Sequence, residues 1–193
     1  IAGEEGSAKT AFLYAILAQA QKRDDDTYLL DAEKAFDGER AAVAGVDLDK
    51  LAILQPKSME ECLSMCSTIL AAHDPVRRCV IGWDSLIAQA PSEIIKDEKV
   101  GRHVGAAGRL TSQESPTIHG MLAAKRAMLV IVNQLRDKPG VMFGPSTTTP
   151  GGRTVKFMAS IRLQFFSGKA IKDAMGDHLG KSITMLVTKT RLS

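Results

Sequence analysis

An eight-residue segment near the start of the chain constrains the fold more than any other feature. Residues 3–10 read Gly-Glu-Glu-Gly-Ser-Ala-Lys-Thr, which fits the pattern G-x-x-x-x-G-K-[S/T] at every position but one. Backbone N–H groups in such a loop hold phosphate oxygens at the opening of a helix, Lys9 reaches the β- and γ-phosphates, and the Thr10 hydroxyl is a Mg²⁺ ligand. We call residues 3–10 the phosphate loop. The segment predicts a strand before the loop, a helix after it, and contact with a nucleotide along Gly3, Glu4, Glu5, Gly6, Ser7 and Ala8.

The exception in the pattern is Ala8, which stands where glycine is expected. A methyl group is tolerated there if φ is negative, or at a strain of order 1 kcal/mol if φ is positive. The alternative interpretation is a chance Lys-Thr pair after a glycine-rich turn.

Strands and helices alternate along most of the 193 residues. Helices are expected over 10–22, 38–44, 58–72 and 105–124, with Pro116 breaking or restarting the last one. Continuous apolar runs predict strands over 28–30, 51–54, 79–83 and 128–132. Such runs are typical of parallel strands covered on both faces. The sequence therefore predicts one α/β domain over residues 1–193, with a mostly parallel central sheet flanked by helices.

The last forty residues follow a different pattern. Apolar and polar residues alternate from Val155 to Phe165, as in a half-exposed strand. Residues 183–191 are expected to pair with it across a polar connection over 167–181. The predicted sheet thus has an antiparallel C-terminal extension.

Composition narrows the class of protein. The chain is 45% hydrophobic and 24% charged with a formal charge of +3, which is ordinary for a globular domain and too small a charge to argue for nucleic acid by itself. No segment predicts a membrane span or a signal peptide. The three cysteines are expected to be buried thiols in a reducing compartment such as the cytoplasm. The four histidines share no ligand spacing and are expected on the surface.

A second acidic motif follows a buried strand. Asp84 ends the run Cys-Val-Ile-Gly-Trp, with Ser85 beside it. A carboxylate at the end of a buried strand is costly without a cation, so we expect Asp84 to hold the Mg²⁺ water shell. A lysine partner or a helix N-terminus is the alternative.

Several further segments carry a family resemblance. They are residues 31–37 (Asp-Ala-Glu-Lys-Ala-Phe-Asp), 133–136 (Asn-Gln-Leu-Arg), 140–144 (Gly-Val-Met-Phe-Gly), 147–149 (Thr-Thr-Thr), 151–152 (Gly-Gly) and 156–163. In this order, and over nearly the whole chain, they resemble the RecA family of DNA recombinases. The resemblance implies a RecA-like P-loop ATPase core.

The resemblance also implies roles for individual residues around ATP. Glu33 would be the general base that activates water, its alternative being a helix cap, and Gln134 would sense the γ-phosphate. Asp37 would approach the adenine edge, and Arg40 stands where the family has a stacking aromatic residue. Ser85 would lie beside the nucleotide. Lys189 and Arg191 would reach the ATP of a neighbouring subunit; two cations guarding an exposed strand edge are the alternative.

Two DNA-binding loops are implied as well. The first would contain Arg102, His103 and Val104, followed by Arg109 and Ser112 on a helix. The second would contain Arg136, Met142, Phe143, Gly151, Gly152 and Arg153. Asp137, Pro139 and Pro116 depart from the family pattern, so these loops are expected to be less typical than the ATP site.

Three functions follow as hypotheses. The first is a DNA-dependent ATPase that forms helical filaments on single-stranded DNA, acts on double-stranded DNA, and promotes strand exchange in recombination and repair. The second is a ring helicase with the same ATP core, and the third is a regulatory ATP-binding module without hydrolysis, which only Ala8 favours. The sequence begins at the phosphate loop and ends within a predicted strand, so we expect a fragment without its N-terminal oligomerisation segment and C-terminal region.

Overall fold

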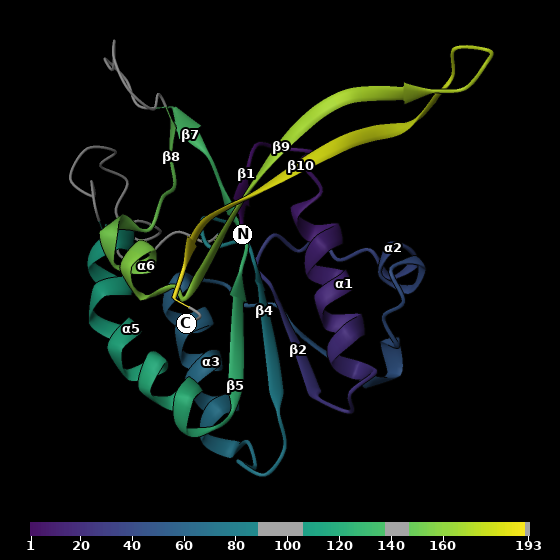
Figure 1. Ribbon diagram of the computed structural model, residues 1–193. Coiled ribbons are helices and arrows are strands. Elements are labelled where there is room, and N and C mark those ends of the chain that lie inside the picture. Colours follow the sequence, from purple (N-terminus) through teal and green to yellow (C-terminus); the bar gives the residue numbers. More distant parts are fainter. Residues whose placement is uncertain (89–105, 138–146, 192–193) are drawn as a thin grey trace.

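The computed structural model describes residues 1–88, 106–137 and 147–191 (Figure 1). Its centre is a parallel sheet with the strand order β3-β2-β4-β5, which we call the central sheet. The bounds are Leu51–Leu54 for β3, Asp26–Asp31 for β2, Cys79–Asp84 for β4 and Ala127–Ile131 for β5. All four strands were predicted from their apolar runs.

A second sheet continues from the first. Its order is β10-β9-β1-β6, with bounds His178–Thr190, Ile161–Lys172, Ala2–Gly3 and Asn133–Gln134 in that order. Strand β1 is parallel to both β6 and β9. Only Val132 separates β5 from β6. Its N–H donates to the Trp83 carbonyl, and the next N–H, of Asn133, donates to the Ile1 carbonyl. One stretch of chain therefore hydrogen-bonds to both sheets.

Helices cover both faces of the central sheet (Figure 1). On one face lie α1 (Lys9–Gln21) and α2 (Gly38–Val43), and on the other α3 (Met59–Ala72) and α5 (Ala106–Ala124). Neighbouring residues of a strand serve different faces, as the period of two requires. Leu29 packs with the α1 cluster and Leu30 with the α3–α5 cluster. The predicted fold class is confirmed.

The N-terminus of α3 is capped by the side chain of Ser58. The Ser58 hydroxyl accepts a hydrogen bond from the Glu61 N–H at 3.2 Å. The Glu61 carboxylate accepts from the Lys57 N–H rather than from that of Ser58. The Ser58 hydroxyl thus satisfies one of the N–H groups that a helix leaves unpaired at its N-terminus.

The expected break at Pro116 was wrong. Helix α5 runs through the proline from Ala106 to Ala124. A proline inside a helix removes one backbone hydrogen bond and crowds the preceding turn. Packing holds the helix on both sides of it, because Thr111 and Ile118 are buried at 2% and 4% exposure.

The strand expected from Val155 was also wrong at its beginning. Residues Gly152–Met158 form helix α6, and β9 begins only at Ile161. Gly151 precedes this helix with φ 90°, a conformation that few other residues adopt. Val155 packs against the α3–α5 cluster, whereas Phe157 is 62% exposed. The apolar alternation over this segment thus belongs to a helix and a strand in succession.

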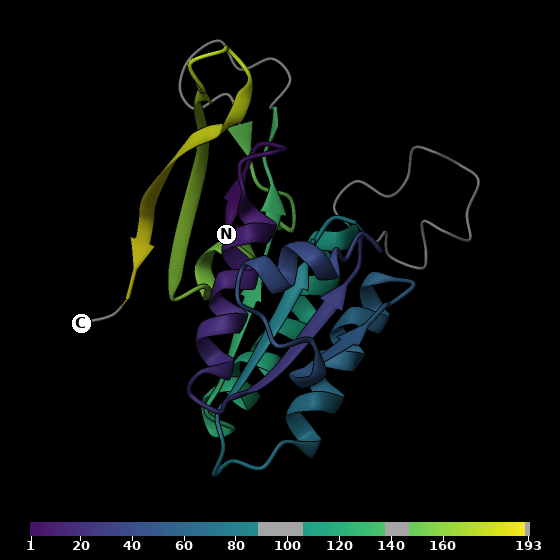
Figure 2. The ribbon, with the colours of Figure 1, turned by 90° about the vertical axis from the view of Figure 1, so that its right-hand side faces the viewer.

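The antiparallel extension is longer than predicted. Strand β9 (Ile161–Lys172) pairs with β10 (His178–Thr190), so that both strands run into the segment expected to be a polar connection. The turn at 173–177 closes on the Asp173 carboxylate, which accepts from the N–H groups of Met175 and Asp177. Figure 2 shows this hairpin rising beyond the helix-covered body.

Smaller elements complete the described chain. They are the 3₁₀ turn Leu48–Lys50 and a short antiparallel pair, β7 (Arg136–Asp137) with β8 (Thr147–Thr148). No helix within the described ranges is long and apolar enough to cross a membrane.

The cysteines and histidines were predicted with unequal success. Cys62, Cys66 and Cys79 are buried free thiols, and burial raises the pKa of each to about 12. His73 is buried, which corrects the expected surface position. Its ring contacts the Arg77 carbonyl at 3.2 Å and lies 3.4 Å from the carboxylate of Asp26.

Candidate nucleotide-binding site

The phosphate loop connects β1 to α1 under tight steric constraint. A Cβ on Gly3 would lie 2.8 Å from the Phe165 carbonyl oxygen of β9, so only glycine fits between the two strands. Ser7 then folds back on the loop, its hydroxyl donating to the Glu4 carbonyl at 2.7 Å. The glycine that opens the motif is therefore required by strand packing, and the buried Ser7 fixes the turn that follows.

Ala8 has a positive φ, which is the strained one of the two conformations considered from the sequence. It stands just before α1 with φ 61° and ψ 25°, in the left-handed region. A residue with a Cβ is disfavoured there by about 1 kcal/mol or more. The loop keeps the conformation that glycine would adopt freely, and the alanine carries the strain.

Lys9 lies across the loop that it belongs to. Its ammonium donates to the Glu4 carbonyl at 2.5 Å, and the residue is 8% exposed. Burial lowers its pKa, although the charges of Asp84, Glu33 and Glu5 act in the opposite direction. The ammonium is thus held against the loop, whose backbone N–H groups would bind phosphate oxygens.

Thr10 and Asp84 meet as the motif predicts. The Thr10 hydroxyl donates to the Asp84 carboxylate at 2.6 Å. Asp84 ends β4, and burial, with further contributions from the Glu33 and Asp31 charges, raises its pKa to about 6 against the opposing effects of Thr10 and Lys9. A buried carboxylate that resists ionisation beside a hydroxyl fits a divalent cation, which would neutralise it. Thr10 and Asp84 are the residues that would hold Mg²⁺.

Glu33 lies next to this pair. The Ser85 hydroxyl donates to its carboxylate at 2.5 Å, and the Gln134 amide donates to the same oxygen at 3.4 Å. The Glu33 N–H donates to the Asp84 carbonyl, which ties the segment after β2 to the end of β4. The structure thus brings together five residues predicted from separate motifs, which we call the nucleotide cluster: Lys9, Thr10, Glu33, Asp84 and Gln134.

Asp31 has a part that sequence reasoning missed. Its carboxylate accepts from the N–H groups of Ala35 and Phe36 and from the Gln55 side chain. These bonds shape the segment that carries Glu33. The signal was available, since Asp31 ends a buried strand just as Asp84 does.

The residues expected at adenine lie at the start of α2. The Asp37 carboxylate accepts from the Arg40 N–H as the helix cap, and the Arg40 guanidinium is 3.2 Å from the same carboxylate. The Arg40 side chain is 84% exposed. Whether either residue touches a base stays a prediction.

Comparison with known proteins decides the family. The model of the RecA N-terminal domain matches residues 1–193. The chain belongs to the RecA family. It is 36% identical over 193 residues to Protein RecA of Lactobacillus acidophilus, covering 99% of this chain and 52% of that protein. It is likewise 36% identical to Protein RecA of Rhodopirellula baltica, over 99% of this chain and 50% of that protein, and to that of Clostridium acetobutylicum, over 100% and 54%. The chain spans about half the length of these curated relatives.

Membership of the RecA family agrees with the order of motifs along the chain and does not favour the ring-helicase alternative. The family does not by itself say what each residue does. Roles within the nucleotide cluster therefore rest on the contacts described above.

Lys189 and Arg191 lie away from the nucleotide cluster of their own chain. The resemblance to RecA predicts that they reach the ATP of a neighbouring subunit. Lys189 donates to the Lys156 and Phe157 carbonyls, at the C-terminal end of α6. Arg191 is exposed, and its N–H donates to the Ser160 carbonyl. Within the described residues, neither side chain contacts the cluster of its own chain.

Part of the DNA-binding set predicted from RecA resemblance gathers where α5 meets α6. The Thr111 hydroxyl donates to the Gly151 carbonyl at 3.2 Å, and the Ser112 and Thr154 hydroxyls are 2.5 Å apart. A Cβ on Gly152 would lie 3.3 Å from the Gly108 Cα, so the two helices approach closely. The exposed residues beside this contact are Arg109 and Arg153.

Other members of that set cannot be placed. Arg102, His103, Val104, Met142 and Phe143 lie outside the described residues. Arg136 is described as part of β7 by its backbone alone.

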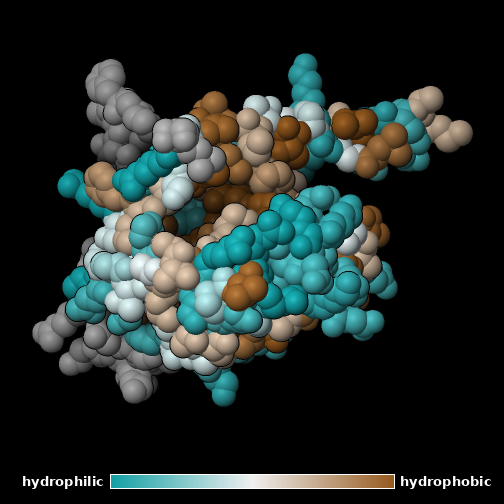
Figure 3. All heavy atoms as spheres, turned by 60° about the horizontal axis from the view of Figure 1, so that its bottom comes forward, coloured by the Kyte–Doolittle hydropathy of each residue, from teal (hydrophilic) through white to brown (hydrophobic). Residues whose placement is uncertain are grey.

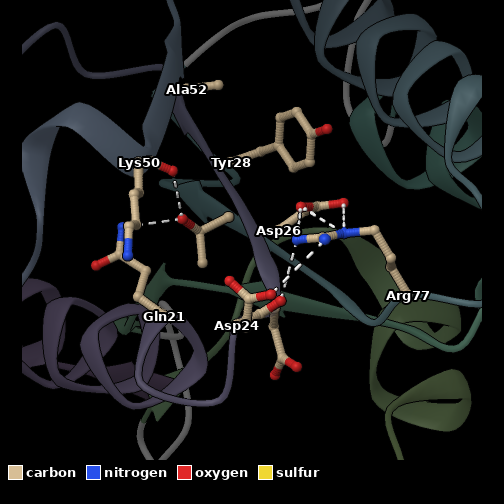
Figure 4. A pocket seen from close by; sticks show the side chains of 9 residues that line it. Gln21, Asp24, Asp26, Tyr28, Lys50, Ala52 and Arg77 are labelled. Atoms are coloured by element: carbon tan, nitrogen blue, oxygen red, sulfur yellow. Dashed lines mark hydrogen bonds and ion pairs between the residues drawn. The ribbon is translucent and has the colours of Figure 1, made fainter.

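A hollow of about 310 Å³ lies at the amino ends of the strands (Figure 4). Its polar side chains are engaged with one another. Arg77 pairs with Asp24 and Asp26, and the Gln21 amide donates to the Thr27 hydroxyl. This hollow contains none of the predicted nucleotide residues, which lie at the opposite edge of the sheet.

Proposed function

We propose that this RecA-family chain is the ATP-hydrolysing core of a DNA-dependent ATPase. The complete protein would form filaments on single-stranded DNA and promote homologous pairing and strand exchange in recombination and repair. The observation that carries the proposal is the nucleotide cluster, in which a lysine, a hydroxyl, two carboxylates and an amide converge from separate motifs.

ATP and Mg²⁺ fit the groups present. The phosphates would lie on the N-terminal end of α1, where backbone N–H groups and Lys9 face them. Thr10 and Asp84 would bind the cation directly or through water. A cation held by these two residues would supply positive charge next to the phosphates, where negative charge develops during hydrolysis.

Glu33 is the group placed to receive a proton from the attacking water. Ser85 and Gln134 both donate to one oxygen of its carboxylate and thereby fix its orientation. Phosphoryl transfer depends mainly on positioning and on electrostatic stabilisation, so a carboxylate oriented by two hydrogen-bond donors suits this role. Gln134 ends β6, and β7 begins two residues later at Arg136. A shift of the Gln134 side chain toward the γ-phosphate would therefore move the start of β7.

Lys189 and Arg191 would act on the ATP of an adjacent subunit. Their distance from their own nucleotide cluster supports this arrangement, because the charge of a neighbour would then complete the site. Such cations stabilise negative charge at the γ-phosphate and make hydrolysis depend on assembly.

DNA would lie along the start of α5 and the start of α6. Arg109 and Arg153 are exposed there, and glycines permit close approach of the backbone to phosphates. Contacts of this kind position a strand without reading its sequence. The relatives named Protein RecA come from bacteria, and we propose the cytoplasm of a bacterium, or of one infected by a phage, as the place of action.

The test is ATP hydrolysis by the complete protein with and without single-stranded DNA. DNA should stimulate the unaltered protein strongly, and Glu33→Gln should reduce the stimulated rate by about 10²- to 10⁴-fold, the usual contribution of a general base. Glu39→Gln, at an exposed position of α2, is the matched control and should keep the full rate. Equal, DNA-independent rates in all three proteins would refute the catalytic assignment and leave an ATP-binding module.

A further inference from the structure

The hairpin β9–β10 passes directly beside the phosphate loop (Figure 1). Ala2 and Gly3 of β1 pair with Gln164 and Phe165 of β9. A few residues farther along β9, the Ser167 hydroxyl donates to the Gly6 carbonyl at 3.4 Å. The hairpin therefore touches the loop itself as well as the strand that leads into it.

A lysine from β10 reaches the same point. The Lys181 ammonium lies 3.0 Å from the position that a Cβ on Gly6 would take. Gly6 has φ 66°, which disfavours any side chain, and a side chain there would also meet this ammonium. The bare backbone of Gly6 thus leaves room for Lys181 against the loop.

The position of Lys181 is set by the strand pairing. Lys181 pairs with Ala170 of β9, and β9 is fixed to α1 through the Phe12 and Phe165 rings, whose centroids are 5.2 Å apart. The lysine is exposed, and among the described residues no carboxylate lies within ion-pair distance of it. Its charge is therefore available to a ligand at the loop.

The loop is short of positive charge for its proposed ligand. Glu4 and Glu5 belong to the loop, and Glu33 and Asp84 lie close behind it. Within the phosphate loop, Lys9 is the positively charged residue that offsets the charge of these carboxylates. A nucleoside triphosphate adds about four negative charges, which a bound Mg²⁺ halves. A second cation would reduce this repulsion substantially at short range.

We propose that Lys181 is a second phosphate-binding lysine, which contacts the polyphosphate of a bound nucleoside di- or triphosphate from the same chain. The inference rests on the proposed nucleotide site. It gives the hairpin a direct part in binding, separate from that of Lys189 and Arg191 at the other end of β10. Lys9 holds the phosphates from the buried side of the loop, and Lys181 holds them from the solvent side.

The first test measures the affinity of the complete protein for Mg²⁺-ADP by calorimetry. A charge-assisted contact at an exposed position predicts roughly tenfold weaker binding for Lys181→Met. Lys181→Arg should bind nearly as the unaltered protein does. Lys172→Met removes the same charge from β9 of the same hairpin and should bind normally.

The second test follows the lysine itself. Acylation of Lys181 by an N-hydroxysuccinimide ester, measured by mass spectrometry, should slow when Mg²⁺-ADP is bound, whereas acylation of Lys172 should not. Unchanged affinity in Lys181→Met together with unchanged acylation would overturn the proposal. So would weaker binding of single-stranded DNA alone, since the lysine would then serve DNA.

The proposed nucleotide site and the second phosphate-binding lysine can be refuted separately. If the unaltered protein binds no nucleotide and Lys9→Met changes nothing, the nucleotide site is refuted and Lys181 with it. If the unaltered protein binds Mg²⁺-ADP and Lys9→Met abolishes binding, normal affinity in Lys181→Met refutes only the second lysine.

Discussion

Acidic residues lie at both ends of the central sheet, but their hydrogen-bond and charge partners differ. At the amino ends, Asp25 is 7% exposed and lies 2.9 Å from Arg23 and 2.7 Å from Arg78. At the carboxyl ends, Asp84 is 8% exposed and has a threonine hydroxyl as its hydrogen-bond donor. The acids are equally buried, but one end supplies arginines and the other does not.

The pKa values follow from this difference. Burial alone would raise the pKa of Asp25, but the hydrogen bonds and charges of Arg23 and Arg78 outweigh it and lower the pKa. At Asp84 burial prevails, and the pKa rises to about 6. In Figure 3 the amino ends of the central-sheet strands are turned toward the viewer, and hydrophilic residues cover much of that face. Arginines balance the buried carboxylate at the amino ends of the strands, whereas Lys9 and Thr10 only partly compensate Asp84 at the carboxyl ends. A buried carboxylate with a raised pKa is a pattern expected at functional sites.

The largest effect is expected from Asp84→Asn. A pKa raised by about two units means that the ionised Asp84 destabilises the fold by ~3 kcal/mol, which the substitution removes. The hydrogen bond from Thr10 is weaker to asparagine than to the carboxylate, which offsets ~1 kcal/mol of this gain. Without nucleotide, we expect the variant to be about 2 kcal/mol more stable at pH 8 in urea unfolding, and to lose most of its affinity for Mg²⁺-ATP. Asp24→Asn, at an exposed position of the amino end, should change neither quantity.

The sign of the pH dependence is a further check on Asp84. The folded state binds the Asp84 proton more tightly than the unfolded state does, so this group stabilises the fold at low pH. That contribution is lost as the pH rises from about 4 to about 6. The advantage of Asp84→Asn should therefore shrink below pH 5. An advantage that stays constant from pH 4 to 8 would contradict the raised pKa.

A smaller effect of opposite sign is expected from Asp25→Asn. The variant loses two ion pairs, whose arginine side chains are about half exposed, so the expected cost is about 1 to 2 kcal/mol in the same unfolding assay. Because the pKa of Asp25 is lowered in the fold, its contribution is present at neutral pH and disappears below about pH 4. A variant as stable as the unaltered protein at pH 7 would remove the contrast between the two ends.

The smallest effect is expected from Ala8→Gly at the carboxyl end. Relief of the left-handed conformation should stabilise the protein by about 1 kcal/mol in thermal or urea unfolding. Ala11→Gly, three residues on and exposed within α1, is the matched control and should destabilise by a similar amount. If both glycines destabilise equally, Ala8 is not strained.

Much of the fold could be predicted because buried parallel strands have a plain signature. Leu51–Leu54 was predicted to the residue, and β4 was predicted up to the Asp84 that ends it. The nucleotide cluster could be predicted for a related reason: motifs at the carboxyl ends of adjacent parallel strands meet at one edge of the sheet.

The remainder depended on tertiary contacts that no local pattern contains. Val155 and Phe157 fit an alternating strand, and only packing of α6 on α5 shows them to be helical. Pro116 predicted a break in α5, but the packing of buried residues on both sides of the proline keeps the helix continuous. The hydrogen bond from the Ser85 hydroxyl to Glu33 could not be predicted either, because it joins residues fifty-two positions apart. That Ser85 lies beside the nucleotide stays a prediction.

The passage of one strand between the two sheets has a consequence for cooperativity. Residues 127–134 bond to β4 in the central sheet and, after Val132, to β1 in the sheet that carries the hairpin. The phosphate loop begins at β1, and Asp84 ends β4, so the same stretch bonds to the strands that carry both halves of the proposed Mg²⁺ site. Separating β4 from β5, or β1 from β6, would displace a stretch of chain that also bonds to the other sheet. We therefore expect the strands on either side of this stretch to open together in hydrogen exchange.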